Sequence, residues 1–150
     1  MKRIKGLKIV ALLAALMMIV LCLGGCSVEV VDNVTTLKDH AFYPSDFPNV
    51  TVGKIVSKYV SSPKWNESKS GGETYVTVTG HIEGFVDDLS MKFSVTDDPS
   101  DKKSVTLDLV SLNLDGESCT ERERYNFLYN LCNAYYDGAS DFGDWVNDNL

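Results

Sequence analysis

The chain has 150 residues, enough for one domain and not comfortably for two, and its 44% apolar and 23% charged residues are typical of a globular protein. The first 25 residues contain four basic side chains and no acid, so residues 26–150 hold 10 Lys and Arg against 21 Asp and Glu, a formal charge of −11. That charge repels phosphate backbones and excludes nucleic acid as a partner on electrostatic grounds.

The N-terminus has the pattern of a secretory signal peptide. Residues 1–8 are basic, and residues 9–23 form an apolar run that is shorter than the about 20 residues of a membrane-spanning helix. We therefore expect residues 1–25 to be a signal peptide, and expect the protein to lie outside the cytoplasm.

The four residues that follow the apolar run, Leu23-Gly24-Gly25-Cys26, resemble the lipobox of bacterial lipoproteins. The resemblance implies cleavage before Cys26 and lipidation of its thiol, which anchors the chain to the extracytoplasmic face of the cell membrane or the outer membrane. By resemblance to the lipoprotein sorting rule, Ser27 in place of Asp would permit export to the outer membrane of a two-membrane bacterium. The sequence leaves the envelope type open. The alternative is an uncleaved signal anchor in which Cys26 is an ordinary thiol.

Residues 26–46 are predicted to be a tether, because polar and β-branched residues are mixed there without sustained periodicity. The valines at positions 28, 30 and 31 leave open an added strand at a sheet edge. The folded domain is expected to span residues 47–150.

A helix is predicted to begin after Asn49 or Thr51 and to end before Pro63. Its apolar residues fall at helical spacing, on one stripe: Val52, Ile55, Val56, Tyr59 and Val60.

Three strands are predicted next, over residues 75–82, 89–96 and 105–114, because apolar and polar residues alternate in each. In the third strand the apolar residues change phase, which predicts a β-bulge near Leu109 and Val110. Gly71-Gly72 and Asp115-Gly116 are predicted turns.

The C-terminal part predicts two helices. Thr120 and Glu123 have the spacing of a capping box, which opens a helix that runs to Tyr136 and stops at Asp137-Gly138. A shorter helix is expected from about residue 140. Cys119 and Cys132 would lie about 19 Å apart along the first helix, too far for a disulfide.

These elements predict an α+β fold in which a helix is followed by a three-stranded antiparallel meander and by C-terminal helices packed on one face, in the order α-β-β-β-α.

The chain also resembles a module of small exported or lipid-anchored bacterial proteins, over about residues 48–116. The matching segments are Thr51-Val52-Gly53, Pro63-Lys64-Trp65, Val76-Thr77-Val78-Thr79-Gly80 and Leu112-Asn113-Leu114-Asp115-Gly116. The resemblance implies a fold and a location, but no catalytic residues. In element order the chain is also similar to the β-lactamase-inhibitor-like fold, which includes small outer-membrane assembly lipoproteins.

No catalytic, metal or cofactor motif is present. His40 and His81 are the only histidines, and Asp39 beside His40 cannot point at it as a catalytic partner would. Asp137, Asp141, Asp144 and Asp148 recur every three or four residues but lack the spacing of a calcium loop. We therefore predict no enzyme, no cofactor and no metal site, with calcium binding and a cleft at His81 as alternatives.

Aromatic residues are dense near the C-terminus. Tyr129, Tyr136, Phe142 and Trp145 are the candidate interaction patch, since aromatic residues are enriched in interface cores. We expect a lipid-anchored, non-catalytic binding module of the bacterial cell envelope, with an envelope protein or a glycan as its partner. The alternative is a specific protein inhibitor or an envelope assembly factor.

Overall fold

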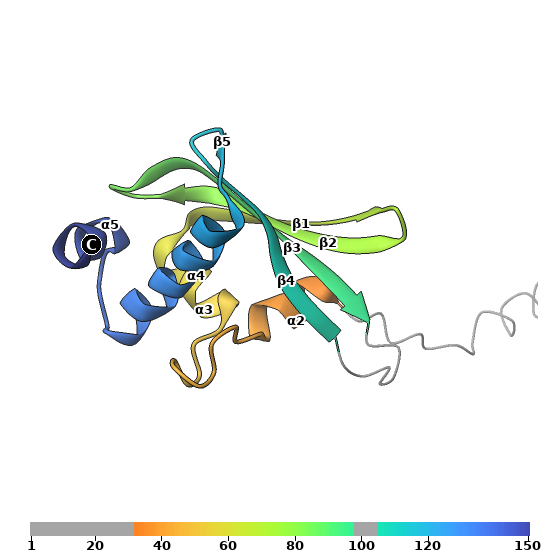
Figure 1. Cartoon of the computed structure of the whole chain (residues 1–150), viewed down its shortest axis with the longest axis horizontal. Coiled ribbons are helices and arrows are strands. Elements are labelled where there is room, and N and C mark those ends of the chain that lie inside the picture. Colours follow the sequence, from red (N-terminus) through yellow and green to blue (C-terminus); the bar gives the residue numbers. More distant parts are fainter. Residues whose placement is uncertain (1–31, 98–104) are drawn as a thin grey trace, which may run out of the picture. The chain divides into compact units, whose positions relative to one another are not determined.

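The computed structural model of the chain describes residues 32–97 and 105–150, which belong to one compact unit. Five antiparallel strands form one sheet in the order β1-β2-β3-β4-β5, and helices α2, α3 and α4 lie on one side of it (Figure 1). The α+β class predicted from the sequence is confirmed. The predicted signal peptide, the lipobox from Leu23 to Cys26 and residues 98–104 lie outside the described residues.

The elements follow one another along the chain with the following bounds. They are α2 (Asn33–Asp39), α3 (Val52–Tyr59), β1 (Ser61–Ser70), β2 (Glu73–Ile82), β3 (Val86–Asp97), β4 (Val105–Leu114), β5 (Glu117–Ser118), α4 (Glu121–Tyr136) and α5 (Phe142–Asn149). The layout therefore has an additional helix before the predicted one, and an additional strand on each side of the predicted meander.

The core lies between the helices and one face of the sheet. Along β2 and β3 every second side chain is buried, and Val78, Met91 and Phe93 are fully so. The intervening residues, such as Thr77 and Lys92, lie on the opposite, polar face. The predicted alternation of these two strands is confirmed, and burial of this face supplies the main apolar driving force for folding.

The predicted bulge in β4 is present. Lys92 of β3 pairs with Ser111, whereas the next residue, Phe93, pairs with Leu109, so Val110 has no partner in the ladder. Because one residue is skipped, Leu109 and Leu112 both face the core although three positions separate them.

Strand β1 was not predicted, whereas the helix before it ends ahead of Pro63, as predicted. Helix α3 ends at Tyr59, and Pro63 lies in an irregularity of β1 between the pairs made by Ser61 and Lys64. A Cβ on Gly80 would lie 2.5 Å from Val60 Cγ1. Only glycine at this position of β2 therefore leaves room for the residue that connects α3 to β1. β1 is an edge strand whose residues are mostly exposed, which is why it shows no alternation.

Both ends of α4 are capped as the sequence predicts. The Thr120 amide donates to Glu123 Oε2 at 2.7 Å, and the Glu123 amide donates to Thr120 Oγ1. At the other end Gly138 has a φ of 77°, and the Ala139 amide donates to the Ala134 carbonyl in a Schellman motif.

The first turns of α4 cover the edge of β4 that faces away from β3. Arg124 Nε donates to the carbonyl of Leu109 at 3.0 Å, and the hydroxyl of Tyr125 donates to Asp108 Oδ1 at 2.7 Å. β5 pairs with β4 only near the end of β4. The two bonds from α4 therefore supply partners for polar groups along the rest of that edge. None of the helices within the two described ranges is long and apolar enough to cross a membrane.

The described part of the predicted tether is folded, which corrects the prediction for residues 33–46. The Asp32 side chain caps α2 by accepting from the Val34 amide at 3.1 Å, and Leu37 of this helix is fully buried. Phe42 and Tyr43 also pack against the core. A seven-residue helix with a single buried side chain has no visible periodicity, which explains why the sequence pattern missed it.

Leu37→Ala tests whether α2 belongs to the folded domain. Since Leu37 is fully buried, its truncation should lower the free energy of unfolding by about 2–5 kcal/mol. Urea unfolding followed by circular dichroism measures this, with Asp39→Ala, at an exposed position of the same helix, as the control. If Leu37→Ala lowered the free energy of unfolding no more than Asp39→Ala, residues 33–46 would belong to a tether and not to the folded domain.

Candidate binding surface

Four aromatic side chains from two segments meet beside α4. Tyr43 and Phe47 lie in the connection between α2 and α3, and Tyr129 and Tyr136 lie seven residues apart on α4. The ring of Phe47 lies 4.9 Å from that of Tyr129 and 5.7 Å from that of Tyr136, between centroids. Tyr43 lies 5.2 Å from Tyr129 in an edge-to-face arrangement. We call these four residues the aromatic surface.

The aromatic surface has a buried base and an exposed top. Phe47 is only 5% exposed, whereas Tyr129 is 38% and Tyr136 is 56% exposed. The hydroxyl of Tyr43 donates to the Tyr125 carbonyl at 3.3 Å, and burial raises the pKa of Tyr43 to about 12. Tyr129 and Tyr136 are therefore partly exposed while their rings contact aromatic neighbours, which limits the ordering cost of binding.

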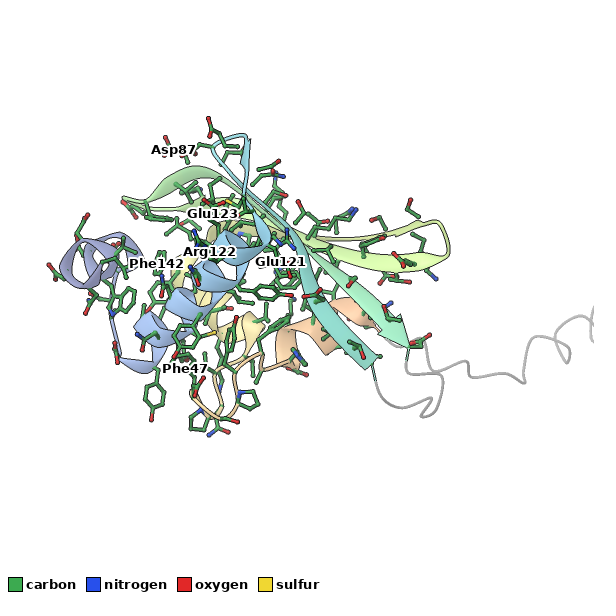
Figure 2. All side chains as sticks on the ribbon, in the orientation of Figure 1. Phe47, Asp87, Glu121, Arg122, Glu123 and Phe142 are labelled. Carbon is green, nitrogen blue, oxygen red and sulfur yellow. The ribbon has the colours of Figure 1, made fainter. Side chains whose placement is uncertain are left out.

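The other two residues of the predicted patch belong to the core, which is a correction. Phe142 is 2% and Trp145 is 8% exposed. Phe142 stacks on Trp145 with ring centroids 6.1 Å apart and contacts Phe127 edge-on, and Trp145 Nε1 donates to Asp137 Oδ2 at 3.2 Å. Figure 2 shows Phe142, the first residue of α5, and Phe47 of the α2–α3 connection in separate places.

The sequence pattern missed Tyr43 and Phe47 because they lie in the predicted tether. Their signal was the unusual density of aromatic residues there, with Phe42, Tyr43 and Phe47 within six positions. A solvated tether has no use for such residues, so their presence indicates packing against a folded surface.

The histidines do not form a catalytic pair. His81 is exposed on β2, whereas His40 is half-buried with its ring 4.7 Å from Phe42, and burial lowers the pKa of His40. No carboxylate accepts a hydrogen bond from either ring among the residues that the structure describes.

Two of the four C-terminal acids accept hydrogen bonds from within the protein. Asp141 accepts from the Asp144 amide at 2.9 Å and caps α5, and Asp137 accepts from Trp145. Within residues 32–97 and 105–150, no three His, Cys, Asp or Glu side chains are grouped as metal ligands.

The two cysteines of the described domain are free thiols, as the predicted separation requires. Cys132 is buried, and burial raises its pKa to about 12, while burial is also the main cause of the raised pKa of Cys119. Both thiols are therefore protonated at neutral pH and are poor nucleophiles.

Comparison of the chain with protein-family models, with curated proteins and with solved structures found no match. Among the predicted site residues, Tyr129 and Tyr136 meet on one surface, Phe142 and Trp145 do not, and Leu23, Gly24, Gly25 and Cys26 lie outside the described residues.

Paired substitutions separate the surface residues from the core residues. Phe142→Ala should lower the free energy of unfolding by about 3–5 kcal/mol because it opens a cavity in the core. Tyr136→Ala should cost at most about 1 kcal/mol, since it removes one partly exposed ring contact with Phe47. Urea unfolding curves measure both values. Equal costs for the two variants would contradict this division.

Proposed function

We propose that this protein is a bacterial lipoprotein, anchored through Cys26 on the extracytoplasmic face of a cell membrane or outer membrane, and that it acts as a non-catalytic binding module. The basic segment, the short apolar run and the lipobox-like residues Leu23, Gly24 and Gly25 support the anchor. The resemblance to a module of small exported or lipid-anchored bacterial proteins supports the same location.

The aromatic surface is the observation that carries the binding function. Exposed tyrosines on a rigid support are typical of interface hot spots, because they bury a large area and lose few rotatable bonds. Tyr129 and Tyr136 meet this description. Phe47 contacts both of their rings, and Tyr43 contacts that of Tyr129. Ring faces of this kind suit the apolar side chains of an envelope protein or the sugar rings of a glycan.

A second candidate function is that of a specific protein inhibitor or envelope assembly factor. A helix followed by an antiparallel meander, as in α3 and β1–β4, favours this proposal by likeness to the β-lactamase-inhibitor-like architecture. The polar outer face of the sheet makes the aromatic surface the place where such a partner would bind. The two proposals differ in whether one protein binds in fixed stoichiometry.

Cys26→Ala tests the anchor. The variant should leave the membrane fraction, because the thioether to the lipid cannot form without the thiol. The measurement is immunoblotting of membrane and soluble fractions together with mass spectrometry of the N-terminus. Cys22→Ala removes a cysteine four residues away, upstream of the cleavage point, and should stay in the membrane. Retention of the Cys26 variant with an intact N-terminus would indicate a signal anchor instead.

Site-specific crosslinking tests the aromatic surface. A photo-crosslinking amino acid at position 129 or 136 of the full chain should capture the same envelope component in cells. Position 85 is the matched control, because Phe85 is 37% exposed, nearly as much as Tyr129, and lies in the turn between β2 and β3. Tyr136→Ala should reduce capture from position 129. Equal capture from position 85, or none from position 129, would exclude this surface.

A further inference from the structure

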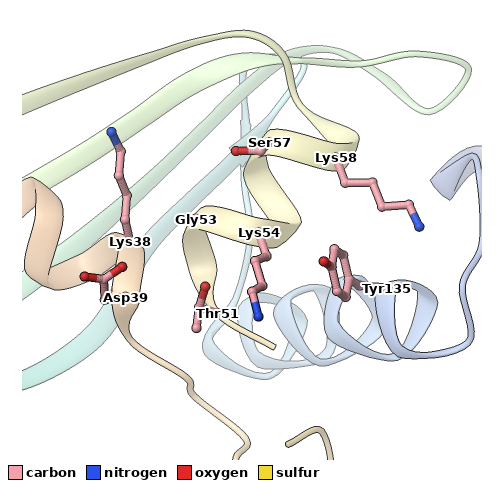
Figure 3. A pocket seen from close by; sticks show the side chains of 8 residues that line it. All are labelled: Lys38, Asp39, Thr51, Gly53, Lys54, Ser57, Lys58 and Tyr135. Carbon is pink, nitrogen blue, oxygen red and sulfur yellow. The ribbon is translucent and has the colours of Figure 1, made fainter. Parts of the chain in front are cut away.

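A groove with a volume of about 490 Å³ lies beside α2, α3 and α4. It is separate in composition from the aromatic surface, since Tyr135 is its one aromatic lining residue. Figure 3 shows three lysines around it, with Lys58 extended over Tyr135 and Lys54 directed toward α4. The complete lining is Lys38, Asp39, Thr51, Gly53, Lys54, Ser57, Lys58 and Tyr135.

The charge of this groove is opposite to that of the chain. The described residues hold eight Lys and Arg and 18 Asp and Glu, yet three of those eight basic side chains and one of the 18 acids line the groove. At physiological ionic strength the Debye length is about 8 Å, so nearby lysines determine the local potential more than distant acids do. The groove is therefore a local cationic site on an acidic protein.

The contacts of the three lysines leave their charge available to a ligand. Lys54 Nζ donates to the Asn49 carbonyl at 2.7 Å, Lys58 Nζ lies 5.1 Å from the centroid of Tyr135, and Lys38 Nζ lies 4.9 Å from that of Trp65. A carbonyl and aromatic rings orient an ammonium group without neutralising it. Three lysine side chains thus line one open volume, and none of these contacts removes their charge.

The first turn of α3 forms part of the groove wall. Thr51 is the N-cap residue of α3, but its side chain makes no capping hydrogen bond, and Gly53 and Lys54 of the first turn line the groove. The Val52 amide of this turn donates to the carbonyl of His40 at 2.9 Å, so the chain at the end of α2 caps α3 in place of the Thr51 side chain. A Cβ on Gly53 would lie 2.9 Å from the Lys38 carbonyl oxygen, so glycine lets α2 approach α3 and brings Lys38 to the groove.

We propose that this groove binds a phosphate group. Phosphate oxygens accept from several lysine ammonium groups at once, and the three groove lysines come from α2 and α3 around one open volume. This inference goes beyond the proposed binding at the aromatic surface, and only its membrane-bound form rests on the proposed anchor. Seven residue steps from Cys26 to Asn33 span at most about 25 Å, so α2 of an anchored chain stays near the lipid headgroups.

Lysine protection tests the proposal on the full chain. The chain in detergent is treated with an amine-modifying reagent. Mass spectrometry then gives the rate at which each lysine is modified, with and without glycerol 3-phosphate. A second arm uses nanodiscs of phosphatidylcholine alone or of phosphatidylcholine with phosphatidylglycerol. Lys38, Lys54 and Lys58 should react several-fold more slowly with bound phosphate, whereas Lys64 and Lys69 of β1 should not change.

The two arms distinguish the source of the phosphate. Protection by glycerol 3-phosphate in detergent supports a soluble or polymer-borne phosphate, and this arm does not depend on the anchor. Protection only with phosphatidylglycerol supports a lipid headgroup. If no arm protects the three groove lysines, or if Lys64 and Lys69 are protected equally, the proposal is overturned.

A pair of double variants gives the matched control. Lys54→Gln with Lys58→Gln should abolish the protection of Lys38, while Lys64→Gln with Lys69→Gln removes the same charge from the edge strand and should preserve it. Circular dichroism confirms that each variant is folded. Equal loss in both double variants would mean that net charge, and not the groove, attracts the phosphate.

Discussion

The apolar face of the sheet must stay continuous across β4 if the helices are to have a surface to cover. Val110 meets this requirement by dropping out of the ladder, which restores Leu112 to the face that already holds Leu109. Without the skipped residue, the second half of the strand would turn its leucine side chains toward the polar face. The position of α4 depends on the same strand, because Arg124 bonds to the carbonyl of Leu109.

With α4 packed against the sheet, two other parts of its surface face away from β4. One side presents Tyr129 and Tyr136 over Phe47, and another presents Tyr135 to the lysine groove. The connection between α2 and α3 serves both, since it contributes Phe47 to the aromatic surface and ends at Thr51 beside the groove. The folding of residues 32–51 against the core is therefore needed for both surfaces.

Sequence patterns predicted the central fold well, because its signals are local and independent of partners. The alternation of β2 and β3, the phase change near Val110 and the capping box at Thr120 each require only neighbouring residues. Strand β1 gave no such signal, since an edge strand with exposed residues on both faces has no apolar period. Helix α2 was not predicted for a related reason, because only Leu37 of its seven residues is buried.

The candidate site was half predictable because aromatic density does not distinguish a buried ring from an exposed one. Tyr136 and Phe142 are six residues apart in a dense aromatic segment, yet one is 56% and the other 2% exposed. The turn at Gly138 separates them by ending α4, after which α5 returns Phe142 to Phe127 in the core. That separation also makes the aromatic surface accessible to experiment. A ring such as Tyr136, which contributes little to the core, can be removed with small effects on folding, so a change in partner capture then reports on binding itself.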